Sequence, residues 1–288
     1  MGKPMVDIDI ATDAPPVIVS TIFSDVISIG AAFGIIVVKL EGYLFEVATF
    51  RNDGQYTDGR HPQQVKFSSM REDALRRDFS INGIYYDPFE DKLFDFVEGI
   101  RDIEKKVIRA IGHPRLRFAE DKLRILRAIR FASSLEFTLD PATERALIKE
   151  APTLVSAVSP ERIWQELKKM MKSHPYQAMV LLLKLKVLVT IFPELRDIPY
   201  SILRSTIEFL NKLNPQKFPE ILLLLPLFQG VPEEATSAAF SRLKVSNKEL
   251  RLIEAWYKAL PHFQNISMSR VFWAHFLASP SASMFLEI

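Results

Sequence analysis

Two aspartates, Asp7 and Asp9, have the spacing in this chain that most directly suggests chemistry. They alternate with apolar residues in the run Val6–Thr12, which predicts a β-strand over 6–11 with a buried apolar face and both carboxylates on the other face. Two negative charges this close repel each other unless a cation lies between them, and Mg²⁺ accepts carboxylate oxygens. The alternative is a solvated edge strand, and the pair alone favours that alternative because the pattern is common.

A third acid, Glu46, lies in the apolar run Leu44–Ala48. A strand at this position would bury a lone carboxylate, which is costly without a compensating partner. We therefore expect Glu46 either to share metal ions with Asp7 and Asp9 or to form a salt bridge with a nearby arginine.

The segment 76–82 places two guanidinium groups beside an acid and an amide: Arg76, Arg77, Asp78 and Asn82. Arginine forks match the geometry of phosphate oxygens, and the amide of Asn82 is able to hydrogen-bond a ribose hydroxyl. The alternative is a cluster of capping contacts and ion pairs at the end of a helix.

A second polar group follows at helical spacing, because Arg117, Asp121, Arg124 and Ala128 would fall on one stripe of a helix, flanked by Glu120. An acid and an arginine one turn apart offer an acceptor and donors to the edge of a base. The alternative is an ion pair within the helix, which contributes little to stability, and without other evidence the spacing favours that alternative.

The elements that would position these groups change in type along the chain. The pattern predicts a strand at 6–11, a helix from Pro15–Pro16 to about Val26, β-rich segments at 29–40 and 43–50 joined through Glu41–Gly42, a polar loop at 51–62, a helix passing into a strand over 73–85, and a short strand at 94–97. From about residue 102 the pattern is helical, with apolar-periodic stretches at 160–172, 175–190, 200–212, 218–229, 233–242, 247–260 and 267–279.

Composition excludes several classes of protein. The chain has 288 residues, 48% hydrophobic and 25% charged, which is ordinary for a globular protein. It contains no cysteine, which excludes disulfides, thiol catalysis and cysteine-ligated zinc, and its five histidines lack metal-ligand spacing. No signal peptide and no membrane-length apolar run is present, so we expect a cytoplasmic protein that does not contact a membrane.

Positive charge is concentrated between residues 101 and 131, where ten lysines and arginines face four acids. Such a stretch is suited to phosphates, although an isolated run of charge is usually a solvated helix face. The basic residues are Arg101, Lys105, Lys106, Arg109, Arg115, Arg117, Lys122, Arg124, Arg127 and Arg130.

Four motifs stand in order along the first 172 residues: VDIDIAT at 6–12, RRDFSING at 76–83, EDKLRILRA at 120–128 and SPERIW at 159–164. In this order the chain resembles the class II tRNA nucleotidyltransferases (CCA-adding enzymes) and bacterial poly(A) polymerases of the polymerase β superfamily. The resemblance implies an α+β protein with a small mixed-sheet nucleotidyltransferase head at 1–100, an all-α neck that recognises the base at 101–172, and a helical RNA-binding body at 173–288.

The resemblance also implies the roles of individual residues. Asp7 and Asp9 would hold Mg²⁺ and, with Glu46, form the catalytic acids. The residues implied for nucleotide binding are Arg77, Asp78, Asn82, Asp121, Arg124 and Arg127, and those expected to bind RNA are Arg115, Arg117, Arg130 and Arg162.

The chain departs from the family pattern at both ends. The family carries a strand and a Gly-Gly-x-Val-Arg-Asp turn before the Asp pair, and here Gly2–Asp7 matches only the end of the spacer. We therefore expect an N-terminal truncation, which would remove a sheet strand and a backbone turn that cradles the triphosphate, and a short C-terminal tail.

The sequence as a whole predicts a template-independent, Mg²⁺-dependent RNA nucleotidyltransferase that uses CTP and ATP to add CCA, or part of it, to tRNA 3′ ends. No feature indicates an obligate protein partner. The alternatives are a poly(A) polymerase, a catalytically silent RNA-binding remnant, and an enzyme that modifies a small molecule, against which the basic stretch argues.

Overall fold

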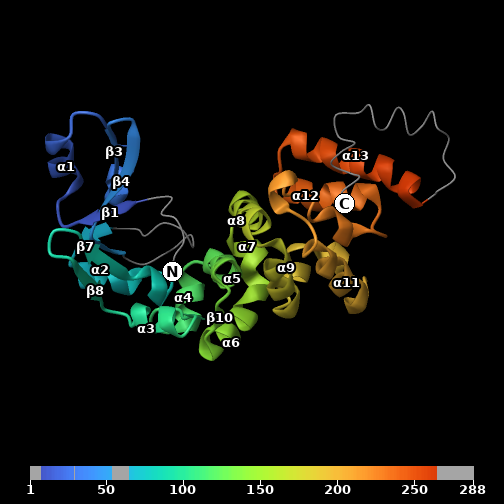
Figure 1. The fold of residues 1–288 in the computed structure, drawn as a ribbon, viewed down its shortest axis with the longest axis horizontal. Helices are drawn as coiled ribbons and strands as arrows, with labels where there is room; N and C mark the ends of the chain where they lie inside the picture. The colour runs from blue at the N-terminus through green and yellow to red at the C-terminus, as the bar shows by residue number, and fades with distance from the viewer. Residues whose placement is uncertain (1–7, 29, 54–64, 265–288) are drawn as a thin grey trace. The chain divides into compact units, whose positions relative to one another are not determined.

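The computed structural model describes residues 8–28, 30–53 and 65–264, and the chain divides into two compact units, Met1–Asp121 and Lys122–Ile288 (Figure 1). The first unit combines short strands with helices and the second is built almost entirely of helices, which confirms the expected α+β class. The boundary between the units lies inside the expected neck. The division at 1–100, 101–172 and 173–288 stays a prediction.

A four-stranded sheet opens the first unit, in the order β1 (Asp9–Thr12), β4 (Tyr43–Thr49), β3 (Ile35–Leu40) and β2 (Val26–Ile27). β1 pairs parallel with β4, and the other neighbours are antiparallel. The β3–β4 hairpin turns at Glu41 and Gly42 as expected. Both residues have positive φ, 50° and 83°, which the tight two-residue hairpin turn requires.

One face of the sheet packs under α1 (Pro16–Ile22), which lies beside it in Figure 1. Val19 of α1 forms a buried cluster with Ile36, Val38 and Val47, so β3 and β4 carry the core and β1 lies at the edge of the described sheet.

Two expectations for this region are wrong. The helix expected to reach Val26 ends at Ile22, because Phe23 is extended and Val26–Ile27 pairs with β3 instead. The apolar face of β1 is not buried, since Ile8 and Ile10 are both exposed at the sheet edge.

The segment expected as a polar loop at 51–62 begins as a strand. β5 (Arg51–Asp53) continues from β4 and pairs with β6 (Val65–Phe67), and the rest of that expected loop lies outside the described residues. α2 (Met70–Arg76) follows, and Ser69 and Glu72 close its N-terminus as a reciprocal capping box. The short 3₁₀ turn η2 (Ser80–Asn82) and the β7 (Ile84–Asp87)–β8 (Lys92–Asp95) hairpin come next.

After this hairpin come α3 (Gly99–Glu104), β9 (Val107–Ile108) and α4 (Pro114–Glu120). α3 lies tightly against η2, because a Cβ added at Gly99 would be 2.3 Å from the carbonyl oxygen of Ser80. β9, and β10 (Thr138–Leu139) in the second unit, correct the expectation that the chain is wholly helical after residue 102.

The second unit is a set of short helices around aromatic and aliphatic cores. α5 (Leu123–Leu135) packs on α8 (Pro160–Ser173) and α9 (Pro175–Lys184). The rings of Trp164, Phe192, Phe228 and Phe240 pack in edge-on or tilted pairs, with centroids 5.2–5.9 Å apart. The other helices are α6 (Pro141–Glu150), α7 (Leu154–Ala157), α10 (Val187–Ile191), α11 (Tyr200–Leu210), α12 (Glu233–Arg242) and α13 (Asn247–Gln264). The stretch expected as a helix at 218–229 is instead a series of turns that ends in the 3₁₀ turn η6 (Leu225–Phe228).

Candidate active site

The parallel pairing of β1 with β4 sets Asp9 directly beside Glu46. Paired residues on neighbouring strands project from the same face of a sheet. Both side chains are exposed, and neither makes a hydrogen bond or ion pair to another described residue. The structure therefore brings together two of the three expected catalytic acids, while Asp7 lies outside the described residues.

The expectation that the β4 strand buries Glu46 is wrong. Val47 is buried and Glu46 is exposed, because the face under α1 takes alternate residues of β4 and leaves Glu46 on the opposite face. The salt bridge considered for Glu46 is absent among the residues that the structure describes.

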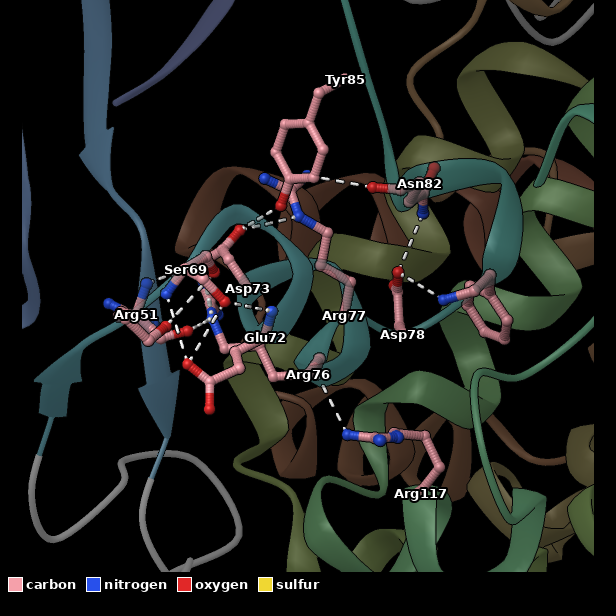
Figure 2. A network of polar contacts seen from close by, with 12 residues as sticks. Arg51, Ser69, Glu72, Asp73, Arg76, Arg77, Asp78, Asn82, Tyr85 and Arg117 are labelled. Carbon is pink, nitrogen blue, oxygen red and sulfur yellow. Dashed lines mark hydrogen bonds and ion pairs between the residues drawn. The ribbon is translucent and has the colours of Figure 1, made fainter. Parts of the chain in front are cut away.

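The segment after α2 gathers Arg77, Asp78 and Asn82, as Figure 2 shows. One carboxylate oxygen of the buried Asp78 accepts hydrogen bonds from the Phe79 backbone N–H and from the Asn82 amide, both at 2.9 Å. Arg77 donates from Nη1 to the Asn82 backbone carbonyl at 3.0 Å. These three expected nucleotide-binding residues therefore form one cluster, whose binding role stays a prediction.

Asp73 is the centre of a second group of contacts that the sequence did not reveal as functional (Figure 2). Its Oδ1 accepts from the Arg51 backbone N–H at 3.1 Å and from Nε and Nη2 of Arg76 at 2.9 and 2.6 Å. Its Oδ2 accepts from Nε of Arg77 at 3.3 Å and from the hydroxyl of Tyr85. A carboxylate that is only 2% exposed thus joins the start of β5, α2 and β7.

The surroundings of Asp73 and Tyr85 shift their proton affinities in opposite directions. Burial alone would raise the pKa of Asp73, but the charge of Arg76 and the hydrogen bonds from Tyr85, Arg76 and Arg51 outweigh it, so the pKa is lowered. Burial raises the pKa of Tyr85, and its hydrogen bond to Asp73 raises it further. Asp73 is therefore held as the anion and Tyr85 as the neutral donor.

The expectation that Arg117, Asp121, Arg124 and Ala128 lie on one face of a single helix is wrong. The helix α4 ends at Glu120, and α5 begins at Leu123. Asp121 between them is extended, with φ −144° and ψ 107°. Asp121 and Arg124 also belong to different compact units, so helical spacing does not place them together.

Arg117 lies in the first unit, and all three nitrogens of its guanidinium donate hydrogen bonds there. It donates to the backbone carbonyls of Leu75, Arg76 and Ile111 at 2.9–3.2 Å and to Glu120 at 3.0 Å, and its side chain is only 16% exposed. Leu75 and Arg76 end α2, so Arg117 caps the carbonyl end of that helix. Arg115, by contrast, is exposed.

In the second unit, the remaining expected binding residues lie on α5 and α8. Arg124 is buried, and Arg127 stacks on the Phe131 ring at 5.2 Å. Arg130 pairs with Glu166 of α8 at 2.7 Å and lies 4.1 Å from the centre of the Phe131 ring. Arg162, on the first turn of α8, is partly exposed. Their roles stay predictions.

No helix in the described part of the chain is long and apolar enough to cross a membrane.

Comparison with known proteins finds a matching family model in each of the two units. Residues 1–109 match the family model of the poly A polymerase head domain, and residues 136–198 match that of a probable RNA and SrmB-binding site of polymerase A. The CCA-adding enzyme of Bacillus licheniformis is 43% identical over 173 residues, which cover 60% of this chain and 43% of the relative. The CCA-adding enzyme of Listeria innocua is 36% identical over 261 residues, covering 90% of this chain and 65% of the relative.

The chain belongs to the poly(A) polymerase and CCA-adding enzyme family.

A solved member of the same family is similar along the whole chain. The crystal structure of the Bacillus stearothermophilus CCA-adding enzyme in complex with CTP superposes with a TM-score of 0.76 and is 29% identical. The match covers 100% of this chain and 67% of that protein, and the chain spans only about two fifths of the length of the B. licheniformis relative that it matches.

We predict that Arg117→Ala destabilises this family member's first unit by about 2–3 kcal/mol, since it leaves helix-end carbonyls without their charged donor. The matched control is Arg115→Ala on the same helix, whose exposed side chain should change the free energy of unfolding by less than about 0.5 kcal/mol. Urea unfolding followed by circular dichroism measures both variants. Equal stabilities would show that Arg117 contributes nothing as a cap.

We predict that Asp73→Asn reduces the loss of stability on acidification. The pKa of Asp73 is lowered in the folded state, so its ionised form stabilises the fold above the unfolded pKa of about 4 and this contribution disappears as the pH falls further. The wild-type free energy of unfolding should therefore fall more steeply below about pH 4 than that of Asp73→Asn. Asp13→Asn, at an exposed aspartate of the same unit, supplies the matched charge change. Parallel pH profiles for wild type and Asp73→Asn would contradict the prediction.

Proposed function

We propose that the protein is a template-independent, Mg²⁺-dependent RNA nucleotidyltransferase that adds CCA, or part of it, to the 3′ end of tRNA from CTP and ATP. In this reaction the RNA 3′-hydroxyl attacks the α-phosphate of the incoming nucleotide, a phosphodiester bond forms, and pyrophosphate leaves. The observation that carries the proposal is the β1–β4 register, which places Asp9 beside Glu46 on an exposed sheet face. Family membership and the names of the relatives support the choice of substrate.

The exposed acids suit a bound divalent cation. Asp9 and Glu46 present only oxygen donors, as Mg²⁺ prefers, and no described cation competes for them. No group of three metal-binding side chains occurs among the described residues, and Asp7 is the further acid that the proposal places there. Bound Mg²⁺ would polarise the α-phosphate and lower the pKa of the attacking hydroxyl. The acids themselves hold negative charge at the point where the two substrates meet.

The Arg77–Asp78–Asn82 cluster is proposed to hold the sugar and phosphates of the nucleotide. Asp78 fixes the Asn82 amide at 2.9 Å, so the amide is oriented before a ligand binds. Arg77 keeps about a third of its side chain exposed and carries the positive charge that a triphosphate requires.

Selection of the incoming base in place of a template is the role proposed for Asp121 in the first unit, and separately for Arg124 and Arg127 in the second. Arg115, Arg130 and Arg162 would contact RNA phosphates, for which salt-dependent binding is expected. RNA binding is also the expectation for Arg117, but its contacts with backbone carbonyls support a structural role.

Poly(A) polymerase activity is the second candidate, because the matching family model is named for that enzyme's head domain. It shares the reaction, so the same acids and the same cluster would serve it. The two activities differ in whether CTP is used.

We predict that the purified chain extends a tRNA lacking its 3′ CCA when Mg²⁺, CTP and ATP are supplied. Asp9→Asn and Glu46→Gln should each lower the rate on the order of 10²-fold or more, because each removes negative charge from the reacting centre. Denaturing gels of labelled tRNA measure the number and identity of the added nucleotides.

Asp25→Asn is the matched control, since Asp25 is an exposed acid of the same unit that pairs with Lys39 at 3.5 Å. Its rate should equal that of wild type. Extension with ATP alone into long tails would replace CCA addition by poly(A) synthesis, and near-normal rates in Asp9→Asn and Glu46→Gln would contradict the assignment of the acids. RNA binding without any extension would leave only an RNA-binding role.

A further inference from the structure

We infer that Tyr85 and the Oδ2 atom of Asp73 are positioning groups for Arg77, which hold its guanidinium ready for the phosphates of an incoming nucleoside triphosphate. The inference rests on the proposed function of Arg77. Neither Asp73 nor Tyr85 was among the residues expected to act in the site.

The guanidinium of Arg77 is fixed from three directions (Figure 2). Nε donates to Oδ2 of Asp73 at 3.3 Å, Nη1 donates to the Asn82 carbonyl at 3.0 Å, and the central carbon lies 4.9 Å from the centre of the Tyr85 ring. The side chain is nevertheless 32% exposed. An arginine that is oriented but still accessible suits the capture of an anion, because less rotamer entropy is lost on binding.

The two carboxylate oxygens of Asp73 accept hydrogen bonds from different residues. Oδ1 serves the backbone of Arg51 and the side chain of Arg76, which join β5 to α2. Oδ2 serves Arg77 and Tyr85. Removal of the Tyr85 hydroxyl therefore disturbs the side of the carboxylate that faces Arg77 and leaves the contacts that hold the helix to the strand.

The Tyr85 ring is itself held in place. It contacts the buried Phe50 ring edge-on, with centroids 5.6 Å apart, and its backbone pairs with Phe94 in the β7–β8 hairpin. The next residue, Tyr86, projects from the opposite face of the same strand. It is 57% exposed, and its hydroxyl donates to Asp91 at 3.0 Å, so it makes the same kind of contact without touching Arg77.

The first test measures the mobility of Arg77 without any nucleotide. In the full chain labelled with ¹⁵N, the Nε–H signal of Arg77 should show restricted motion in wild type and in the control Tyr86→Phe. It should be mobile in Tyr85→Leu, which removes both the ring and the hydroxyl, and intermediate in Tyr85→Phe. An Arg77 signal that stays equally restricted in Tyr85→Leu would overturn the inference.

The second test measures ATP binding by titration calorimetry in the presence of Mg²⁺. Tyr85→Phe should weaken binding roughly threefold to tenfold, as expected when one side chain must be ordered on binding, with the melting temperature close to that of wild type. Tyr86→Phe should bind as wild type does. In an Arg77→Ala background, Tyr85→Phe should have no further effect, because it acts through Arg77.

The two failures can be told apart. If Arg77→Ala binds ATP as well as wild type does, the proposed nucleotide role of Arg77 is wrong, whatever its mobility. If Arg77→Ala weakens binding but Tyr85→Phe does not, or if the two effects are additive, the role of Tyr85 is wrong and the proposed function stands.

Discussion

The parallel register of β1 against β4 is the constraint on which the candidate site depends. Strand side chains alternate between faces, so a shift of β1 by one residue would turn Asp9 to the face opposite Glu46. The packing of Val47 with Val19, Ile36 and Val38 fixes the face of β4 from which Glu46 projects. Burial of one face of β4 therefore fixes Glu46 on the other, and the pairing of β1 brings Asp9 beside it, although neither acid makes a stabilising contact among the described residues.

The buried carboxylate of Asp73 positions the neighbouring Arg77–Asp78–Asn82 cluster. Asp73 collects donors from Arg51, Arg76, Arg77 and Tyr85, which belong to three separate elements of the first unit. A buried charge is tolerated only when it is paired and hydrogen-bonded, and here every contact also orients a donor. The start of β5, α2 and β7 are thus joined through one side chain. The Arg77–Asp78–Asn82 cluster follows directly from the C-terminus of α2.

Turns and helix caps in the first unit were predictable from local sequence patterns. The wrong predictions concern features that depend on tertiary packing. The hairpin at Glu41–Gly42 has turn residues whose backbone preference decides the structure. Ser69 and Glu72 likewise have the three-residue spacing that a capping box requires. No proline or glycine marks the break between helices at Asp121, so the periodicity wrongly predicted one continuous helix face across it. The burial assigned to Glu46 assumed an environment that only the packing of α1 determines.

The positive charge of a residue alone predicted its functional role poorly. Arg115 and Arg117 are two residues apart and were expected to act alike, yet one is exposed and the other caps α2. Arg76 and Arg77 lie at helical spacing from Asp73, but Arg51 and Tyr85 lie 22 and 12 residues away, and no spacing rule connects these two to it. Asp9 and Glu46 lie on strands that are distant in sequence, so the resemblance to the family, and not their spacing, favoured a shared metal site over a salt bridge.

The central claim is that Asp9 and Glu46 form one side of a divalent cation site. Mn²⁺ accepts the same oxygen ligands as Mg²⁺ and broadens nearby nuclear magnetic resonance signals. The most direct measurement is therefore a Mn²⁺ titration of the ¹⁵N-labelled full chain. We expect selective broadening of the amides around residues 9 and 46, reversed by excess Mg²⁺ and absent from the Asp9→Asn/Glu46→Gln double variant. Broadening that spares these amides, or that persists unchanged in the double variant, would contradict it.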